Sequence, residues 1–234
     1  MTDTFAVLQK ELREQVGERS SRRGGLIQSL VIVSILGIAM PASAAQAWLA
    51  ESPLAILYFA MLPAMLAGTV AADAFAGERE RKTLETLLAT PLSERSILVG
   101  KGAAAIAFAL TAAAFAFLCA VITVNLTAHP AAIFVPSVRL VAGALGGVLA
   151  SASLITGVAI VLSMRVPVAR SVQQMTAVSG MLLFGAVGAA WSALGLPLTW
   201  ANVFAGEGAV LLAAIAVFEI ARATFRRDRF FERR

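Results

Sequence analysis

Six long apolar runs, nearly free of charge, constrain the fold of this chain more than any other feature. They cover residues 26–48, 53–76, 102–125, 138–164, 174–196 and 208–223, and they are rich in alanine, leucine and glycine. A helix needs roughly 20 apolar residues to cross the hydrocarbon core of a membrane. Backbone polar groups find no water there, so each run must satisfy its own, as a helix does. The sequence therefore predicts an all-α, polytopic membrane protein with six transmembrane helices.

Composition excludes several other classes of protein. The chain has 234 residues, of which 59% are hydrophobic and 14% charged, whereas soluble domains average about 45–50% and about 25%. An ordinary soluble enzyme and a disordered chain are excluded. The single cysteine, Cys119, permits no intrachain disulfide, and the lone histidine, His129, completes no metal site or catalytic set. We expect one transmembrane domain over residues 1–234, with no catalytic and no metal-binding residues.

The basic residues gather in alternate connections between the runs. Of the 19 lysines and arginines, 18 lie before the first run, after the second, after the fourth or after the sixth, and only Arg139 lies elsewhere. Basic residues concentrate in cytoplasmic loops, so both termini are expected in the cytoplasm. Residues 1–25 are predicted to hold an amphipathic interfacial helix, and residues 224–234 a basic cytoplasmic tail. Topology accounts for the net charge of +5, and nucleic acid is not an expected partner.

Ionisable residues inside the runs are few. Asp73 lies near the inner end of the second run, where a salt bridge or hydrogen bond to the following segment is favoured over substrate binding. Arg139 lies near the outer end of the fourth run, as an interface anchor or as a guide for an anionic substrate. No charge falls in the middle of a run, which disfavours a proton relay or an ion-coupled transporter.

Residues 77–101 carry most of the functional information. This segment holds nine of the 33 charged residues of the chain. Leu84, Leu87 and Leu88 form an apolar stripe at helical spacing, the residue before Pro91 disfavours helix, and Ser93 is placed to cap the next helix. The pattern predicts a short amphipathic helix on the cytoplasmic face. Periodicity alone fits either a linker at the lipid surface or a docking helix for a soluble partner.

The order of residues around this segment resembles a known family signature. Residues 73–93 read DAFAGERERKTLETLLATPLS, and residues 97–101 read ILVGK. This resembles the signature of type-2 ABC transporter permeases, the membrane subunits of ATP-driven exporters. Lys82 stands where glycine is common in that family, a change expected to be tolerated on an exposed helix. The N-terminal LQKELRE at residues 8–14 resembles the family's opening amphipathic helix.

The resemblance implies partners and a role for residues 77–101. Two permease protomers, identical or related, would pair in the prokaryotic inner membrane, each on a cytoplasmic ABC ATPase subunit. The segment after the second span would be the coupling helix that inserts into the ATPase. The chain has no G-x-x-x-x-G-K-[ST] loop, so it is not expected to be an enzyme, and ATP and Mg would be bound by the partner. The implied coupling residues are Gly77, Glu78, Arg79, Arg81, Thr83, Leu84, Glu85, Leu87, Leu88 and Pro91.

Other functions remain open from the sequence. A permease of the haem-exporter type used in cytochrome c maturation has similar length and topology, although the GERERKTLE stretch fits it less well. A membrane scaffold is a second alternative, in which the ATPase cycle drives assembly or regulation without moving a solute. A membrane protein with no ATPase partner is a third.

Overall fold

The computed structural model describes residues 4–5, 7–11, 19–81, 93–130 and 132–224. Within these ranges the chain is helical apart from short connections, and no strand is present. The prediction of an all-α protein is therefore confirmed for the described residues. The elements are α2 (Arg19–Ser34), η1 (Ile35–Ala39), α3 (Met40–Ser43), α4 (Ala45–Leu49), η2 (Pro53–Ile56), α5 (Leu57–Ala72), η3 (Asp73–Gly77), α6 (Glu78–Glu80), α8 (Glu94–Ala128), α9 (Val138–Arg165), α10 (Ala169–Ala193) and α11 (Trp200–Thr224).

Five helical stretches of the described chain are long and apolar enough to cross a membrane: Pro53–Glu80, Arg95–Ala128, Val138–Arg165, Ala169–Ala193 and Trp200–Thr224. They correspond to the second through sixth apolar runs. The first run contains only a shorter apolar helix, Ile27–Ser43. Length and composition thus identify five candidate spans, and a shorter apolar helix in the first run.

Local backbone geometry breaks the first apolar run. Residues 35–39 form a π-helical turn, Pro41 follows it, and Ala44 leaves the helical region with φ −122° and ψ 29°. The Thr123 hydroxyl of α8 donates to the Gly37 carbonyl at 2.7 Å, inside that turn. A π-turn disturbs the regular hydrogen-bond ladder, and here a neighbouring helix binds one of its carbonyls.

Two other helices extend well beyond the apolar runs that predicted them. The helix of the third run begins at Glu94, with Ser93 as its N-cap, as expected: the Ser93 hydroxyl accepts from the Ser96 amide at 3.1 Å. Its 35 residues span about 52 Å at 1.5 Å per residue, more than a bilayer core of about 30 Å. The last helix begins at Trp200 rather than at residue 208. Glu207, expected in a connection, therefore lies inside α11.

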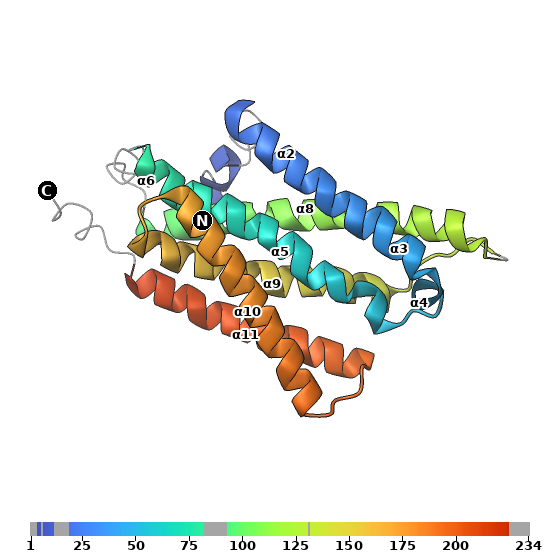
Figure 1. Cartoon of the computed structure of the whole chain (residues 1–234). Helices are drawn as coiled ribbons and strands as arrows, with labels where there is room; N and C mark the ends of the chain where they lie inside the picture. The colour runs from blue at the N-terminus through green and yellow to red at the C-terminus, as the bar shows by residue number, and fades with distance from the viewer. Residues whose placement is uncertain (1–3, 6, 12–18, 82–92, 131, 225–234) are drawn as a thin grey trace, which may run out of the picture.

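The long helices form a bundle in which α9 is central (Figure 1). It packs most extensively against α5 on one side and α11 on the other. Helix α6, the start of α8, the α9–α10 connection and the C-terminal end of α11 lie at one end of this bundle, which we name the basic end (Figure 1). Helix α10 starts there beside α5 and diverges from the bundle toward its C-terminal end. Residues 185–190 of α10 are accordingly all exposed.

Aromatic packing fixes the other end of the bundle. Trp48 of α4, Phe59 of α5 and Phe117 of α8 have ring centroids 5.6–6.1 Å apart. All three are almost completely buried. Tilted and edge-on aromatic contacts at these separations are favourable. They join the kinked N-terminal apolar segment to two of the long helices.

Candidate functional site

A fully buried lysine organises the basic end of the bundle. Lys101 of α8 has no exposed surface. Its Nζ lies 2.7 Å from Glu11 Oε1, 2.8 Å from Glu78 Oε1 and 3.1 Å from the Ala74 carbonyl oxygen. An ammonium group has three donors, and each meets an acceptor here. Burying a charge is costly unless it is paired and hydrogen-bonded, and both conditions hold for Lys101.

These contacts join three parts of the chain that are distant in sequence. Glu11 belongs to the helical residues 7–11, Glu78 begins α6, and Lys101 lies in the second turn of α8. Close packing accompanies the ion pairs: a Cβ added to Gly100 would lie 2.7 Å from Val7 Cγ1. Burial raises the pKa of the Glu11 carboxyl, and the neighbouring Lys101 opposes that shift. The N-terminal residues are therefore anchored to α8 by packing and by charge.

The N-terminal helical residues present two different faces. Val7 and Glu11 are buried against the bundle, whereas Phe5 is 65% exposed. Leu8 is half-buried between these two faces. Such an arrangement suits a helix that packs on a protein on one side and on lipid on the other.

Four consecutive charged residues each contact a different element. Glu78 binds Lys101, as described, and lies 3.9 Å from the Lys10 ammonium group. Arg79 Nη1 donates to the carbonyls of Ser163 at 2.9 Å and Met164 at 3.4 Å. These carbonyls belong to the last turn of α9, where no helical partner is available and a cation is favoured.

The next two charges complete the pattern. The Ala169 amide, at the start of α10, donates to Glu80 Oε2 at 3.2 Å. The N-cap residue of α10 provides no side-chain cap, so Glu80 supplies the acceptor that a helix N-terminus needs. Arg81 Nη1 lies 3.4 Å from Asp73 Oδ1. We name residues 78–81 and Lys101, with Glu11 and Asp73, the charged junction.

A π-turn sets the direction in which the junction leaves α5. Element η3 covers Asp73–Gly77, and the Asp73 carboxylate lies beside Gly77 at the other end of this turn. A Cβ at position 77 would overlap Asp73 Oδ1. Glycine is therefore required for the carboxylate to reach Arg81. Such π-turns inside helices occur frequently at functional sites.

The structure places the predicted coupling residues unequally. Gly77 ends η3 directly before the charged junction, to which Glu78, Arg79 and Arg81 belong, and Glu78 and Arg79 bind other parts of this chain. Thr83, Leu84, Glu85, Leu87, Leu88 and Pro91 lie outside the described residues. Arg139 is exposed in the first turn of α9, far along the chain from the junction.

Sequence reasoning missed the roles of Lys101 and Glu11. Lys101 was recognised only as the end of the ILVGK motif and as one of the basic residues. Gly100, directly before Lys101, was an available signal, because a glycine at the membrane boundary allows another helix to approach the lysine closely. Its acidic partners are 90 and 23 residues away in sequence, a pairing that periodicity does not reveal.

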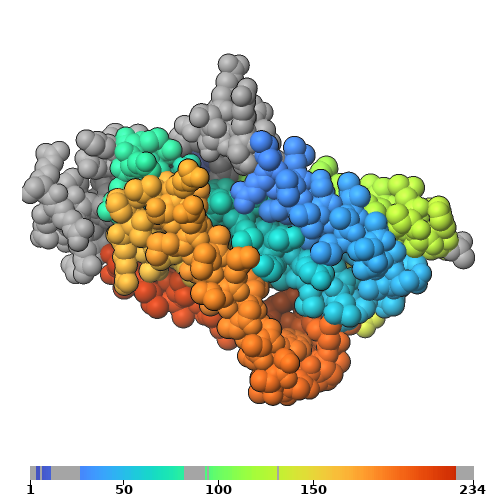
Figure 2. All heavy atoms as spheres, in the orientation of Figure 1, coloured from blue at the N-terminus to red at the C-terminus, as the bar shows by residue number. Residues whose placement is uncertain are grey.

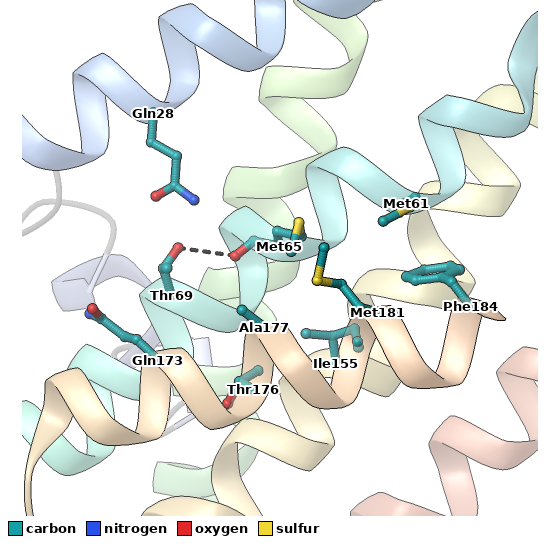
Figure 3. A pocket seen from close by; sticks show the side chains of 11 residues that line it. Gln28, Met61, Met65, Thr69, Ile155, Gln173, Thr176, Ala177, Met181 and Phe184 are labelled. Atoms are coloured by element: carbon teal, nitrogen blue, oxygen red, sulfur yellow. Dashed lines mark hydrogen bonds between the residues drawn. The ribbon is translucent and has the colours of Figure 1, made fainter. Parts of the chain in front are cut away.

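A small cavity opens between α2, α5, α9 and α10. Its volume is about 60 Å³. Figure 3 shows Gln28 reaching from α2 toward the α5 side of this space, while Met65 of α5 and Met181 of α10 face it. The buried Thr176 hydroxyl at its edge has no hydrogen-bond partner among the residues that the structure describes. Flexible methionine side chains with a few polar groups make a lining that adapts to different ligands.

Apolar helices of spanning length, joined at one end by a charged junction, define a multi-pass helical membrane protein. Comparison with known proteins identifies its family. Residues 5–201 match the family model described as ABC-2 family transporter protein. The chain therefore belongs to the ABC-2 family and is an ABC transporter permease. The resemblance found in residues 73–101 is thereby confirmed.

One curated relative is similar over part of the chain. It is the ABC transporter permease protein NatB of Bacillus subtilis (strain 168), 30% identical over 112 residues. The alignment covers 48% of this chain and 22% of NatB. The chain therefore spans only a minor part of the length of that relative.

Proposed function

We propose that this chain is the membrane-spanning permease subunit of an ATP-driven exporter in a prokaryotic inner membrane. It has six spans and cytoplasmic termini, and the short helix Ile27–Ser43 with α4 makes the first crossing. A second permease protomer completes the transporter, and each protomer binds one ABC ATPase subunit, which holds ATP and Mg. The distribution of basic residues and the family membership support this assignment.

The charged junction is the observation that carries the coupling mechanism. A force applied to residues 82–92 by the ATPase reaches the bundle through residues 78–81 on one side and through Ser93 and α8 on the other. Those four residues contact α8, the N-terminal helical residues, the end of α9 and the start of α10. Moving one short segment therefore displaces several helix ends together. Residues 83–91, with Glu85 and the leucine stripe, make the ATPase contact in this proposal, while Glu78 and Arg79 transmit the movement.

The cavity between α2, α5 and α10 is the part of the protomer best suited to line the transport path. It lies among the candidate spans and carries polar groups, Gln28 and Gln173, where lipid would favour apolar ones. Rearrangement at the start of α10 by Glu80 would reach this cavity along the same helix. ATP binding and hydrolysis on the partner would thus alter the path from the basic end.

Co-purification with the ABC ATPase encoded beside this chain tests the proposal. Glu85→Lys with Leu88→Asp is expected to abolish assembly with the ATPase. Arg79→Ala is expected to leave assembly intact but to uncouple ATP hydrolysis from transport in reconstituted vesicles. Arg95→Ala, an exposed charge in the first turn of α8, is the matched control and should change neither.

Three outcomes would count against the proposal. Failure of any ABC ATPase to co-purify with the wild-type chain would remove the coupling role altogether. A complex that hydrolyses ATP and moves no solute in either direction across vesicle membranes would favour the scaffold alternative. Specific stimulation of ATP hydrolysis by haem would favour the haem-exporter alternative.

A further inference from the structure

An acidic side chain lies at membrane depth in α11 and has no role in the mechanism above. Glu207 is seven residues after Trp200, where the helix begins, or about 10 Å along its axis. It is only partly exposed, and within the described part of the chain it has neither a hydrogen bond nor an ion pair. Ionisable residues inside transmembrane segments are costly, and they commonly mark substrate or ion pathways.

Two glycines of α9 make room for this carboxylate. A Cβ added to Gly146 would lie 2.8 Å from Glu207 Oε2, and one added to Gly147 would lie 3.2 Å from Oε1. Gly147 also contacts Ala60 of α5. Both carboxylate oxygens thus rest on glycines in a seam between α5, α9 and α11. Gly146 and Gly147 therefore make room for a carboxylate between the helices, in addition to letting the helices pack closely.

Aromatic rings lie next to the carboxylate on the same face of α11. Trp200 and Phe204 precede Glu207 by seven and three residues, and their ring centroids are 5.8 Å apart. A Cβ added to Gly143, one turn of α9 before Gly147, would lie 2.7 Å from the Trp200 ring. Trp191 of α10 packs over Gly206, the residue before the carboxylate. Phe204 is 38% exposed, so its ring is accessible from outside the protomer.

The surface is hollowed at this place. Figure 2 shows a recess between the beginning of α5 and the outward-leaning half of α10, with α11 at its floor. The divergence of α10 leaves residues 185–190 exposed and keeps the recess open. The helix at the floor of the recess, α11, is the one that carries Trp200, Phe204 and Glu207.

We propose that this seam, centred on Glu207 with Trp200 and Phe204, binds an organic cation with an apolar body, such as a quaternary ammonium or phosphonium ion. Carboxylates attract such ions without needing hydrogen-bond donors, and aromatic faces attract them through cation–π contacts. A bare metal ion fits less well, since hard cations need several oxygen ligands. The described residues place no group of three or more His, Cys, Asp or Glu side chains together. That the bound cation is a transported cargo rests on the proposed function, whereas cation binding is measured independently of it.

Equilibrium binding of tetraphenylphosphonium to the full chain in nanodiscs tests the proposal, with empty nanodiscs as background. Wild type is expected to bind it saturably, and Glu207→Gln to weaken that affinity by about tenfold or more. Gly146→Ala should also weaken binding, because its Cβ displaces the carboxylate without removing the charge. Glu219→Gln is the matched control: this carboxylate of the same helix is exposed and pairs with Arg222 at 2.8 Å. Neutral triphenylphosphine oxide should bind wild type and Glu207→Gln alike.

Equal affinity of wild type and Glu207→Gln for tetraphenylphosphonium would overturn the proposal, as would an equal loss in Glu219→Gln. Absence of saturable binding to wild type would do the same. Glu207→Asp, which keeps the charge, should retain most of the affinity and guards against a folding defect in the glutamine variant. Co-purification with the ATPase is scored separately on each variant. Its failure in wild type refutes the proposed function alone, whereas cation binding that does not depend on Glu207 refutes this inference alone.

Discussion

At the scale of single residues, the basic end shows how a membrane protein keeps charges buried at a boundary. The apolar runs and the charge distribution were readable from sequence because each depends on residues close together in the chain. The partners of Lys101 were not readable, because Glu11, Glu78 and the Ala74 carbonyl meet only after the helices pack. The same limit explains Glu207, which the pattern had placed just outside the last run.

Removing Lys101 should be strongly destabilising. Lys101→Met would leave the buried Glu11 carboxylate without its lysine and would remove the nearer of the two ammonium groups beside Glu78, and breaking a buried ion pair in this way costs about 3–5 kcal/mol. Combining it with Glu11→Gln and Glu78→Gln should restore most of the lost stability, because no buried charge is then unpaired. Thermal unfolding of the purified permease in detergent measures both. A triple variant no more stable than Lys101→Met would contradict this account.

The pH dependence of stability should report on Glu11. Burial raises the pKa of Glu11 above its ordinary value of 4.5, so the folded state holds this proton to higher pH than the unfolded state does. The stability from that proton is fully present below pH 4.5 and is lost as the pH rises through the folded-state pKa. Wild type should therefore lose stability relative to Glu11→Gln between acidic and neutral pH. Melting temperatures of wild type and Glu11→Gln over this pH range measure the trend, and parallel curves for the two proteins would contradict it.

At the scale of elements, the long helices follow from apolar runs, whereas their irregularities do not. Hydrophobic length predicts that a segment forms a helix, and five of the runs became candidate spans. The π-turn at residues 35–39 binds Thr123, a residue 86 positions from Gly37 that the local sequence does not specify. The bounds of α8 and α11 were missed for a related reason, because a helix continues into polar residues wherever caps and packing permit.

Gly77→Ala should disturb the π-turn and the junction together. Its Cβ would overlap the Asp73 carboxylate, which must then rotate away from Arg81. Overpacking of this kind costs about 1–3 kcal/mol. Gly185→Ala is the matched control, since nothing lies within 4 Å of a Cβ added there. Thermal unfolding should separate the two variants, and equal melting temperatures would show that η3 tolerates a side chain.

Arg79→Ala should loosen the end of α9. The lost hydrogen bonds join a charged donor to carbonyls of Ser163 and Met164, and such bonds contribute about 1.5–3 kcal/mol. Amide hydrogen exchange should rise in the last turn of α9 and at the start of α10. Exchange near Trp48, at the opposite end of the bundle, should stay unchanged. A uniform increase along the chain would instead indicate a general folding defect.

At the scale of the whole molecule, the two ends of the bundle differ in structure. One end is fixed to the charged junction, where movement of residues 78–81 reaches α8, α9 and α10. Toward the other end, α10 diverges from the bundle (Figure 1) and leaves a recess with α11 at its floor (Figure 2). A displacement at the start of α10 is therefore expected to alter the width of that recess, since a helix transmits movement along its length.

The number of membrane crossings decides on which side of the membrane each end of the bundle lies. Labelling α4 measures that number. If the kinked segment before α4 crosses the membrane, Gln46, an exposed residue of α4, lies outside together with His129. In a Cys119→Ser background, Gln46→Cys and His129→Cys should then react with a membrane-impermeant maleimide in intact cells. Arg170→Cys and Thr4→Cys should react only after permeabilisation. If Gln46→Cys also required permeabilisation while His129→Cys did not, the chain would cross five times, and the N-terminal segment would lie along the inner leaflet. The charged junction would still join that segment to α8 through Glu11 and Lys101.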